Sequence, residues 1–263
     1  MDADFKARAD VRELLAGALD ARNSEAGKAA LEQLVANADI AAEGRLPLCQ
    51  DCGYITVFAA VGQDVSFDGP FEPAVQAGVV KAHRDGFLRQ SVIKDALKAR
   101  TEPETDRPAT VYVKLVPGAT VTLDVFPKGG GSDNAGRLVM LRPTADEEEI
   151  VRFVVDAVAQ AGPSACPPLF VGVGIGGSFD SVALLAKRAL LRDFRVPTSD
   201  PIIRALEDRL RAGIDKLGIG PGGLGGETTA LGVSVATDKT HIGCLPVAVN
   251  ISCNQLRSAG GEL

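Results

Sequence analysis

Several residue types are scarce or missing, and each absence narrows the classes of protein to which this chain can belong. The 263 residues include no Trp, two Tyr and two His, so few side chains can act as general bases near neutral pH. No apolar run approaches the roughly 18 residues of a membrane span, and the N-terminal segment lacks the apolar stretch of a secretory leader. The 28 Lys and Arg stand against 34 Asp and Glu, whereas nucleic-acid binders usually show a basic excess. We therefore expect a cytoplasmic protein that binds neither a membrane nor a nucleic acid.

The chain has the composition of an ordinary globular protein, with 46% apolar and 24% charged residues. Apolar stripes at helical spacing predict two helices within the first 40 residues, and further helices over 72–88, 144–160, 178–194 and 201–217. Runs rich in β-branched residues predict strands over 54–61, 110–116, 120–126, 169–173, 229–237 and 245–251. This mixture predicts an α/β or α+β fold, with mixed β-sheets flanked by helices.

Short signals mark several element ends. Pro117-Gly118 separates two strand-like runs and indicates a hairpin between them. The spacing of Thr144 and Glu147 is that of a capping box, and Asp200-Pro201 has the pattern of an N-cap followed by the first helical position. The acidic stretch 102–107 is expected to form a surface loop.

Three Gly-rich loops cover residues 128–132, 172–177 and 218–226. Consecutive glycines either gather backbone N–H groups around an anion or form tight turns in which only glycine fits. The loop 172–177 also matches the G-x-G-x-x-G fingerprint of dinucleotide sites. That fingerprint requires a second strand ending in an acidic residue about 20 positions on, and the sequence continues into another helix instead. We therefore expect no bound NAD.

The cysteines are the next signal, because there are five and they are widely spread: Cys49, Cys52, Cys166, Cys244 and Cys253. In a reducing compartment such cysteines bind metal or take part in catalysis more often than they form disulfides. The C-x-x-C pair at 49–52 alone fits a redox dithiol or half of a zinc site, but no second C-x-x-C follows. Two interpretations stay open: the cysteines are scattered buried residues, or distant thiols converge on an iron–sulfur cluster in the folded chain.

Seven stretches with distinctive residues follow one another over nearly the whole length. They are 46–53 (LPLCQDCG), 61–65 (VGQDV), 86–91 (GFLRQS), 127–134 (PKGGGSDN), 166–177 (CPPLFVGVGIGG), 222–226 (GGLGG) and 240–253. In this order they resemble the α-type portion of class I fumarate hydratases and L-tartrate dehydratases, which are iron–sulfur hydro-lyases. No single stretch is decisive, but the set is specific.

The resemblance implies a [4Fe–4S] cluster held by Cys49, Cys166 and Cys253, with one iron not ligated by cysteine. An open iron position suits Lewis-acid chemistry on a 2-hydroxy dicarboxylate. The implied reaction is the reversible dehydration of malate to fumarate, with L-tartrate dehydration as the alternative. An alternative of another class is a non-catalytic cluster scaffold or redox sensor, which would not need the substrate-binding residues.

The resemblance also assigns roles to residues beside the motifs. Asp51 is the expected acid at the substrate hydroxyl, and His241 is expected to hydrogen-bond the substrate or the metal-bound oxygen. Gln50 and the backbone N–H of Gly130 are expected to contact the substrate, and the planar guanidinium of Arg89 is suited to clamp a carboxylate.

In the family, the remaining catalytic groups belong to a β-type portion. Residue 263 follows the last cluster cysteine by only ten positions, so we expect residues 1–263 to be one α-type domain that works with a separate β subunit, as an α2β2 assembly. The chain departs from the family pattern at Cys52, Cys244, Asn254 and the loop 101–107. We expect Cys52 and Cys244 to be small buried residues rather than extra ligands, and the loop leaves the substrate's identity open.

Overall fold

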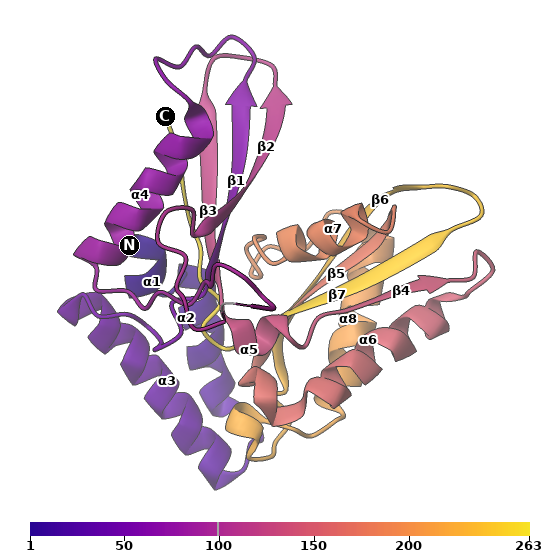
Figure 1. Cartoon of the computed structure of the whole chain (residues 1–263). Coiled ribbons are helices and arrows are strands. Elements are labelled where there is room, and N and C mark those ends of the chain that lie inside the picture. The colour runs from indigo at the N-terminus through magenta and orange to yellow at the C-terminus, as the bar shows by residue number, and fades with distance from the viewer. Residues whose placement is uncertain (99) are drawn as a thin grey trace. The chain divides into compact units, whose positions relative to one another are not determined.

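The computed structural model describes residues 1–98 and 100–263, which form two compact units. Unit 1 comprises Met1–Arg8, Ala38–Gly130 and Arg257–Leu263, and unit 2 comprises Ala9–Asn37 and Gly131–Leu256. Each unit contains a four-stranded mixed sheet with helices packed on it (Figure 1). This confirms the predicted fold class, while the single family domain over 1–263 stays a prediction.

Most of the first 44 residues are helical, as predicted. They form α1 (Asp2–Phe5), α2 (Ala9–Gly17), the 3-10 turn η1 (Ala18–Asp20) and α3 (Glu25–Gly44). Val11, Leu15 and Leu31, which belong to the predicted apolar stripes, are fully buried. Within the described residues, no helix is long and apolar enough to cross a membrane.

The sheet of unit 1 has the strand order β2-β1-β3-β8. Its strands are β1 (Tyr54–Gly62), β2 (Ala109–Val116), β3 (Val121–Lys128) and β8 (Ala259–Glu262). β1 pairs in parallel with β2 and antiparallel with β3. Helix α4 (Phe71–Asp85) covers one face of the sheet, where Val79 packs with Ile55, Val57 and Ala109.

The predicted hairpin across Pro117-Gly118 is wrong, because β1 lies between β2 and β3. β1 is buried along most of its length, so its apolar side chains favour the interior of a sheet over an edge. The link from β2 to β3 therefore crosses the end of β1, where the N–H of Asp64 donates to the Gly118 carbonyl at 3.0 Å. A Cβ on Gly62 would lie 2.3 Å from the oxygen of Gly118, so glycine permits this crossing.

The sheet of unit 2 has the order β4-β7-β5-β6, in which β5 runs parallel to β6 and antiparallel to β7. Its strands are β4 (Arg137–Leu141), β5 (Leu169–Gly177), β6 (Ala230–Thr240) and β7 (Leu245–Ser252). Helix α7 (Ser181–Ala189) covers one face, and α6 (Glu147–Ala161) and α8 (Pro201–Asp215) cover the other (Figure 1). The short elements α5 (Gly130–Asp133), η2 (Gly162–Ala165) and η3 (Pro221–Gly223) lie in the connections.

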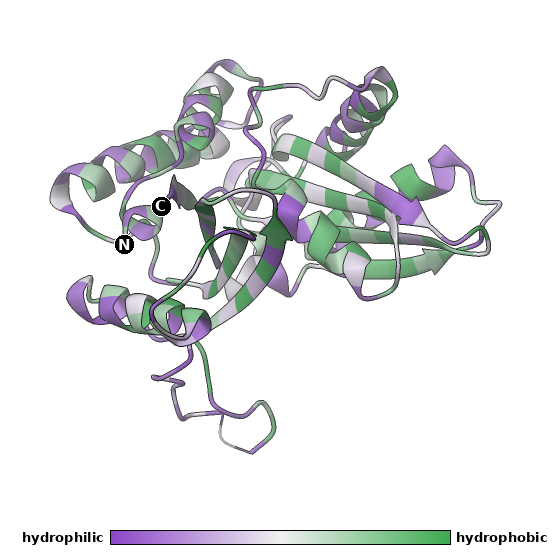
Figure 2. Ribbon diagram, turned by 90° about the horizontal axis from the view of Figure 1, so that it is seen from above, coloured by the Kyte–Doolittle hydropathy of each residue, from purple (hydrophilic) through white to green (hydrophobic). Residues whose placement is uncertain are grey.

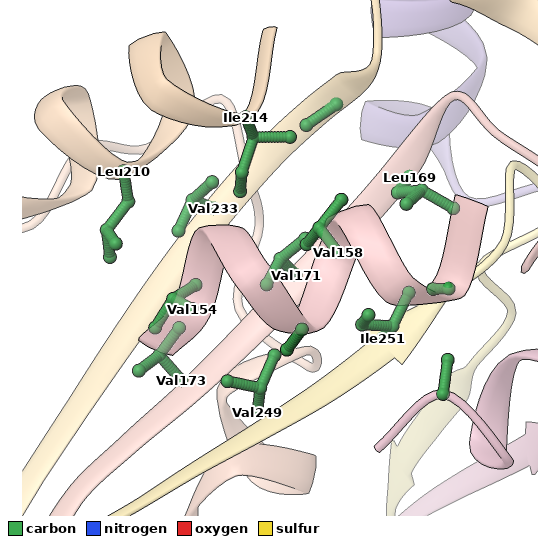
Figure 3. Packing of buried hydrophobic residues seen from close by; sticks show 14 of the residues in the cluster. Val154, Val158, Leu169, Val171, Val173, Leu210, Ile214, Val233, Val249 and Ile251 are labelled. Carbon is green, nitrogen blue, oxygen red and sulfur yellow. The ribbon is translucent and has the colours of Figure 1, made fainter. Parts of the chain in front are cut away.

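The main core of unit 2 fills the space between the sheet and the pair α6 and α8. Figure 3 shows Val154 and Val158 of α6 close to Val171 and Val173 of β5, and all four are fully buried. Each such buried side chain contributes roughly 1.5–3 kcal/mol relative to an exposed one. Figure 2 shows hydrophobic residues concentrated along the strands, with hydrophilic residues interspersed around the helices.

Helix starts agree with the predictions in one case and correct them in another. Asp200 caps α8, because its carboxylate accepts from the N–H groups of Ile202 and Ile203. The cap of α6 is Asp146, which accepts from the N–H of Glu149 at 2.9 Å, so the predicted capping box at Thr144 is wrong. An ionised carboxylate is the stronger acceptor, and it also interacts favourably with the helix dipole.

Candidate functional site

The segment that leads into β1 carries three of the predicted site residues of unit 1. The thiol of Cys49 donates to Oε1 of Gln50 at 3.2 Å, and the N–H of Asp51 donates to the Cys49 sulfur at 3.5 Å. Cys49 is half-buried and has a free thiol, and Gln50 is exposed. The local backbone thus turns around the sulfur and leaves it available as a soft ligand.

Asp51 is held at both carboxylate oxygens. Its Oδ1 accepts from the N–H of Gly53 and its Oδ2 accepts from the N–H of Gly130, each at 2.9 Å. The bond from Gly130 joins residues 79 positions apart in the sequence, and the two bonds together give the half-buried carboxylate one orientation. The Gly130 N–H that the sequence assigned to the substrate donates to Asp51 here, and its contact with a substrate stays a prediction.

Arg89 lies just after the end of α4 and is held through its backbone. Its N–H donates to the sulfur of Cys52 at 3.1 Å, and Cys52 packs with Phe5 and Leu88 in a small apolar cluster. Cys52 is buried, as expected, and this burial raises the pKa of its thiol. The Arg89 side chain is exposed and forms no hydrogen bond or ion pair with any residue in 1–98 or 100–263. Its guanidinium is therefore available for an anion.

Unit 2 brings Cys166 and Cys253 together. Both the backbone N–H and the side-chain amide of Asn254 donate to the Cys166 carbonyl, at 3.1 and 2.8 Å. Cys166 has a φ of 56°, in the left-handed region that residues other than glycine seldom adopt. Its side chain is exposed, while Cys253 is half-buried. Asn254, which appeared only as a departure from the family pattern, therefore connects the two cysteine segments.

His241 lies in the turn between β6 and β7. The N–H of Gly243 donates to its Nδ1 at 3.1 Å, which places the proton of the neutral ring on Nε2. The N–H of Cys244 donates to the His241 carbonyl at 2.8 Å and closes the turn. The ring is exposed and so offers an N–H donor to a ligand.

The G-x-G-x-x-G stretch has a packing role. A Cβ on Gly172 would lie 2.2 Å from the backbone oxygen of Ala186, and one on Gly174 would lie 2.6 Å from that of Val182. Both oxygens belong to α7, so these glycines let the helix approach β5 closely. This accounts for two of the three glycines without a nucleotide.

Comparison with known proteins decides the family. The family described as fumarate hydratase (fumerase) matches residues 1–262. The chain belongs to the fumarate hydratase family. This confirms the predicted membership and the predicted reaction class, which is that of a hydro-lyase.

Relatives within the fumarate hydratase family match most of the chain. The protein named "Putative L(+)-tartrate dehydratase subunit alpha" of Methanocaldococcus jannaschii is 36% identical over 249 residues, which are 93% of this chain and 87% of that protein. The L(+)-tartrate dehydratase subunit alpha of Escherichia coli strain UTI89 is 31% identical, and that of strain K12 is 30% identical. Each alignment with these two covers 93% of this chain and 81% of the relative.

The cysteine side chains that would bind the family's iron–sulfur cluster are of the right chemical type. Cys49, Cys166 and Cys253 lie on loops or at element ends, and each is at least partly exposed. Cys49 lies in unit 1 with Gln50, Asp51, Arg89 and Gly130, whereas Cys166, Cys253 and His241 lie in unit 2. Among the residues that the structure describes, no group of three or more His, Cys, Asp or Glu side chains is arranged to hold a metal ion.

Proposed function

We propose that this chain is the α subunit of a two-subunit [4Fe–4S] hydro-lyase that dehydrates a 2-hydroxy dicarboxylate. The observation that carries the proposal is the Cys49–Asp51 segment, where a free thiol lies two residues from a carboxylate oriented by two backbone N–H groups. It occurs in a chain that the fumarate hydratase family matches from residue 1 to 262.

Cys49, Cys166 and Cys253 would hold the cluster, since thiolates are the usual ligands of iron–sulfur centres. When bound, the cluster supplies a Lewis acid through the iron that no cysteine ligates. Asn254 would keep the segments of Cys166 and Cys253 adjacent, through the two bonds to the Cys166 carbonyl.

The other site residues act on the substrate. Arg89 would bind a carboxylate through its unpaired guanidinium, for which the planar fork is suited. Asp51 would deliver a proton to the departing hydroxyl oxygen, which leaves as water, and its two backbone donors would stabilise the carboxylate that results. The proton on the neighbouring carbon would go to a base of the β subunit, and the C–H electron pair would form the double bond. His241 would donate its Nε2 proton to a substrate oxygen. Gln50, exposed beside Cys49, would orient the substrate through its amide.

Malate, L-tartrate and a methylated analogue are candidate substrates, because each carries a hydroxyl on a carbon next to a carboxylate. The names of the three relatives described above, each a tartrate dehydratase α subunit, favour tartrate. The same names support a separate β subunit that supplies the rest of the site, and we infer an α2β2 assembly.

The test is anaerobic purification of the chain together with its candidate β subunit, followed by iron, sulfide and absorption measurements. We expect about four irons per chain and absorption near 400 nm. Replacing Cys49, Cys166 or Cys253 with Ser should abolish this absorption, and Cys244→Ser, the matched control, should retain it. Zinc or no metal in the reconstituted protein would refute the proposal.

Turnover of malate, fumarate and L-tartrate by the complex identifies the substrate. Arg89→Ala should abolish turnover and leave the absorption intact, whereas Arg84→Ala, an exposed arginine of α4 paired with Asp85, should change neither. Undiminished turnover in Arg89→Ala would overturn the substrate assignment. We also expect activity to disappear in air and to return with ferrous iron and thiol, because an iron without a protein ligand is easily lost.

A further inference from the structure

A buried ion pair supports the Cys49–Asp51 segment from within unit 1. Nη1 of Arg257 donates to Oδ1 of Asp4 at 3.0 Å, and Nη2 of Arg257 donates to the backbone carbonyl of Asp51 at 2.8 Å. The backbone carbonyl of Asp4 also accepts from the N–H of Leu48 at 2.8 Å. The pair therefore contacts both ends of the segment between Leu48 and Asp51.

Both partners of this pair are almost completely inaccessible, with Asp4 and Arg257 each 2% exposed. Removing two charges from water is unfavourable, and a well-packed apolar pair often serves the core equally well. A contribution to folding stability is therefore a weak explanation for a charged pair at this buried position. An arginine can also fix the relative orientation of two acceptors. Its planar guanidinium donates to both at once in fixed directions, which a lysine ammonium does not reproduce.

The second acceptor links the pair to the proposed chemistry. The carbonyl that Arg257 binds belongs to Asp51, whose carboxylate oxygens accept from Gly53 and Gly130. Cys49 lies two residues earlier and Cys52 one residue later, and the Cys52 sulfur accepts from the backbone of Arg89. Fixing the carbonyl of Asp51 therefore restrains the predicted acid, a predicted ligand and the backbone of Arg89.

We propose that Arg257, held by Asp4, is a positioning residue that sets the orientation of the Cys49–Cys52 segment. The inference rests on the proposed function for its chemical meaning, but its test does not require the cluster. It identifies two residues outside the segment, 253 positions apart in the sequence, on which the geometry of the site depends.

The rate of Cys52 alkylation reports how often the Cys49–Cys52 segment opens. The Cys52 thiol is 2% exposed and reacts only when the segment opens. The experiment treats the metal-free full-length chain with iodoacetamide and follows each cysteine by mass spectrometry, with half-buried Cys244 of unit 2 as the internal reference. Loss of one charge-assisted hydrogen bond in Arg257→Lys should accelerate alkylation of Cys52 by about 10- to 100-fold relative to Cys244.

Arg192→Lys is the matched control. Arg192 forms an equally close pair with Glu207 in unit 2, through bonds of 2.7 and 2.9 Å, and Glu207 is also buried. This variant should lower thermal stability as Arg257→Lys does, yet leave the Cys52 rate unchanged. An equal acceleration in both variants, or none in Arg257→Lys, would overturn the proposal.

A second variant separates positioning from folding. The double replacement Asp4→Asn with Arg257→Met leaves no unpaired buried charge and still removes the donor to Asp51. It should accelerate Cys52 alkylation as Arg257→Lys does, and a wild-type rate would show that packing alone holds the segment. An inactive wild-type complex would instead refute the proposed hydro-lyase function, while the alkylation rates would still decide the positioning role.

Discussion

The close approach of α7 to β5 predicts a large effect of the smallest substitution at Gly172. In Gly172→Ala the added methyl group would lie 2.2 Å from the backbone oxygen of Ala186 and 2.9 Å from the side chain of Leu190. Backbone cannot yield as a flexible side chain does, so the helix must move away from the strand. Overpacking of this kind costs about 2–3 kcal/mol. For a chain of this size, that corresponds to a decrease in Tm of about 4–12 °C.

Thermal and urea unfolding of the purified chain measure this change. The control is Gly78→Ala, because Gly78 lies in the interior of α4 and a Cβ there meets no atom within 4 Å. Alanine is the better helix former, so this variant should gain about 0.5–1 kcal/mol. If Gly172→Ala is as stable as the wild type, the packing role of the glycines is wrong. Any measurable NAD binding that Gly172→Ala abolishes would restore the dinucleotide interpretation.

Three further predictions concern the contacts that hold the helices in place. Asp146→Ala should lower the stability by about 1 kcal/mol through loss of the α6 cap. Thr144→Ala should change the stability by less than about 0.5 kcal/mol. Equal effects of the two substitutions in chemical denaturation would contradict Asp146 as the cap. Gln76→Ala should lower the free energy of unfolding by about 2–3 kcal/mol, because this buried amide bonds both the N–H and the carbonyl of Ala109. A decrease below about 1 kcal/mol would show that the two backbone groups find other partners. Burial raises the pKa of Asp215 above its ordinary value, so its ionised form opposes folding at neutral pH and this penalty disappears as the pH falls through the folded-state pKa. Asp215→Asn keeps the acceptor for Thr229 and Ala230 and should be at least as stable as the wild type at pH 7, with an advantage that shrinks toward pH 4; an advantage that grows on acidification would refute the sign.

Local patterns in the sequence predicted most elements, but they did not predict how the strands pair. The segments of β1, β5, β6 and β7 are recognisable because each is a run of β-branched and small apolar residues. β8 was missed because Ala259–Glu262 contains two glycines, and it is a strand only through pairing with β3. β4 was missed because it is a half-exposed strand of five residues, without a buried pattern.

The site shows the same division between local and long-range information. Motif order identified Asp51 and Cys166 as candidates, but not the contacts that orient them. Asp51 is held by Gly130, 79 residues away, and the Cys166 carbonyl is held by Asn254, 88 residues away. Such pairings depend on the register of several strands and helices together, which no window of sequence encodes.

The order in which a ribosome makes the chain gives the Asp4–Arg257 pair another consequence. Arg257 emerges from the ribosome 253 residues after Asp4. At about 5–20 residues per second, the interval is roughly 13–50 s. β8, which completes the sheet of unit 1, emerges later still. Until Arg257 has emerged, Asp4 can be buried only without its counterion, so the Cys49–Cys52 segment reaches its final arrangement only after residue 257 has been made.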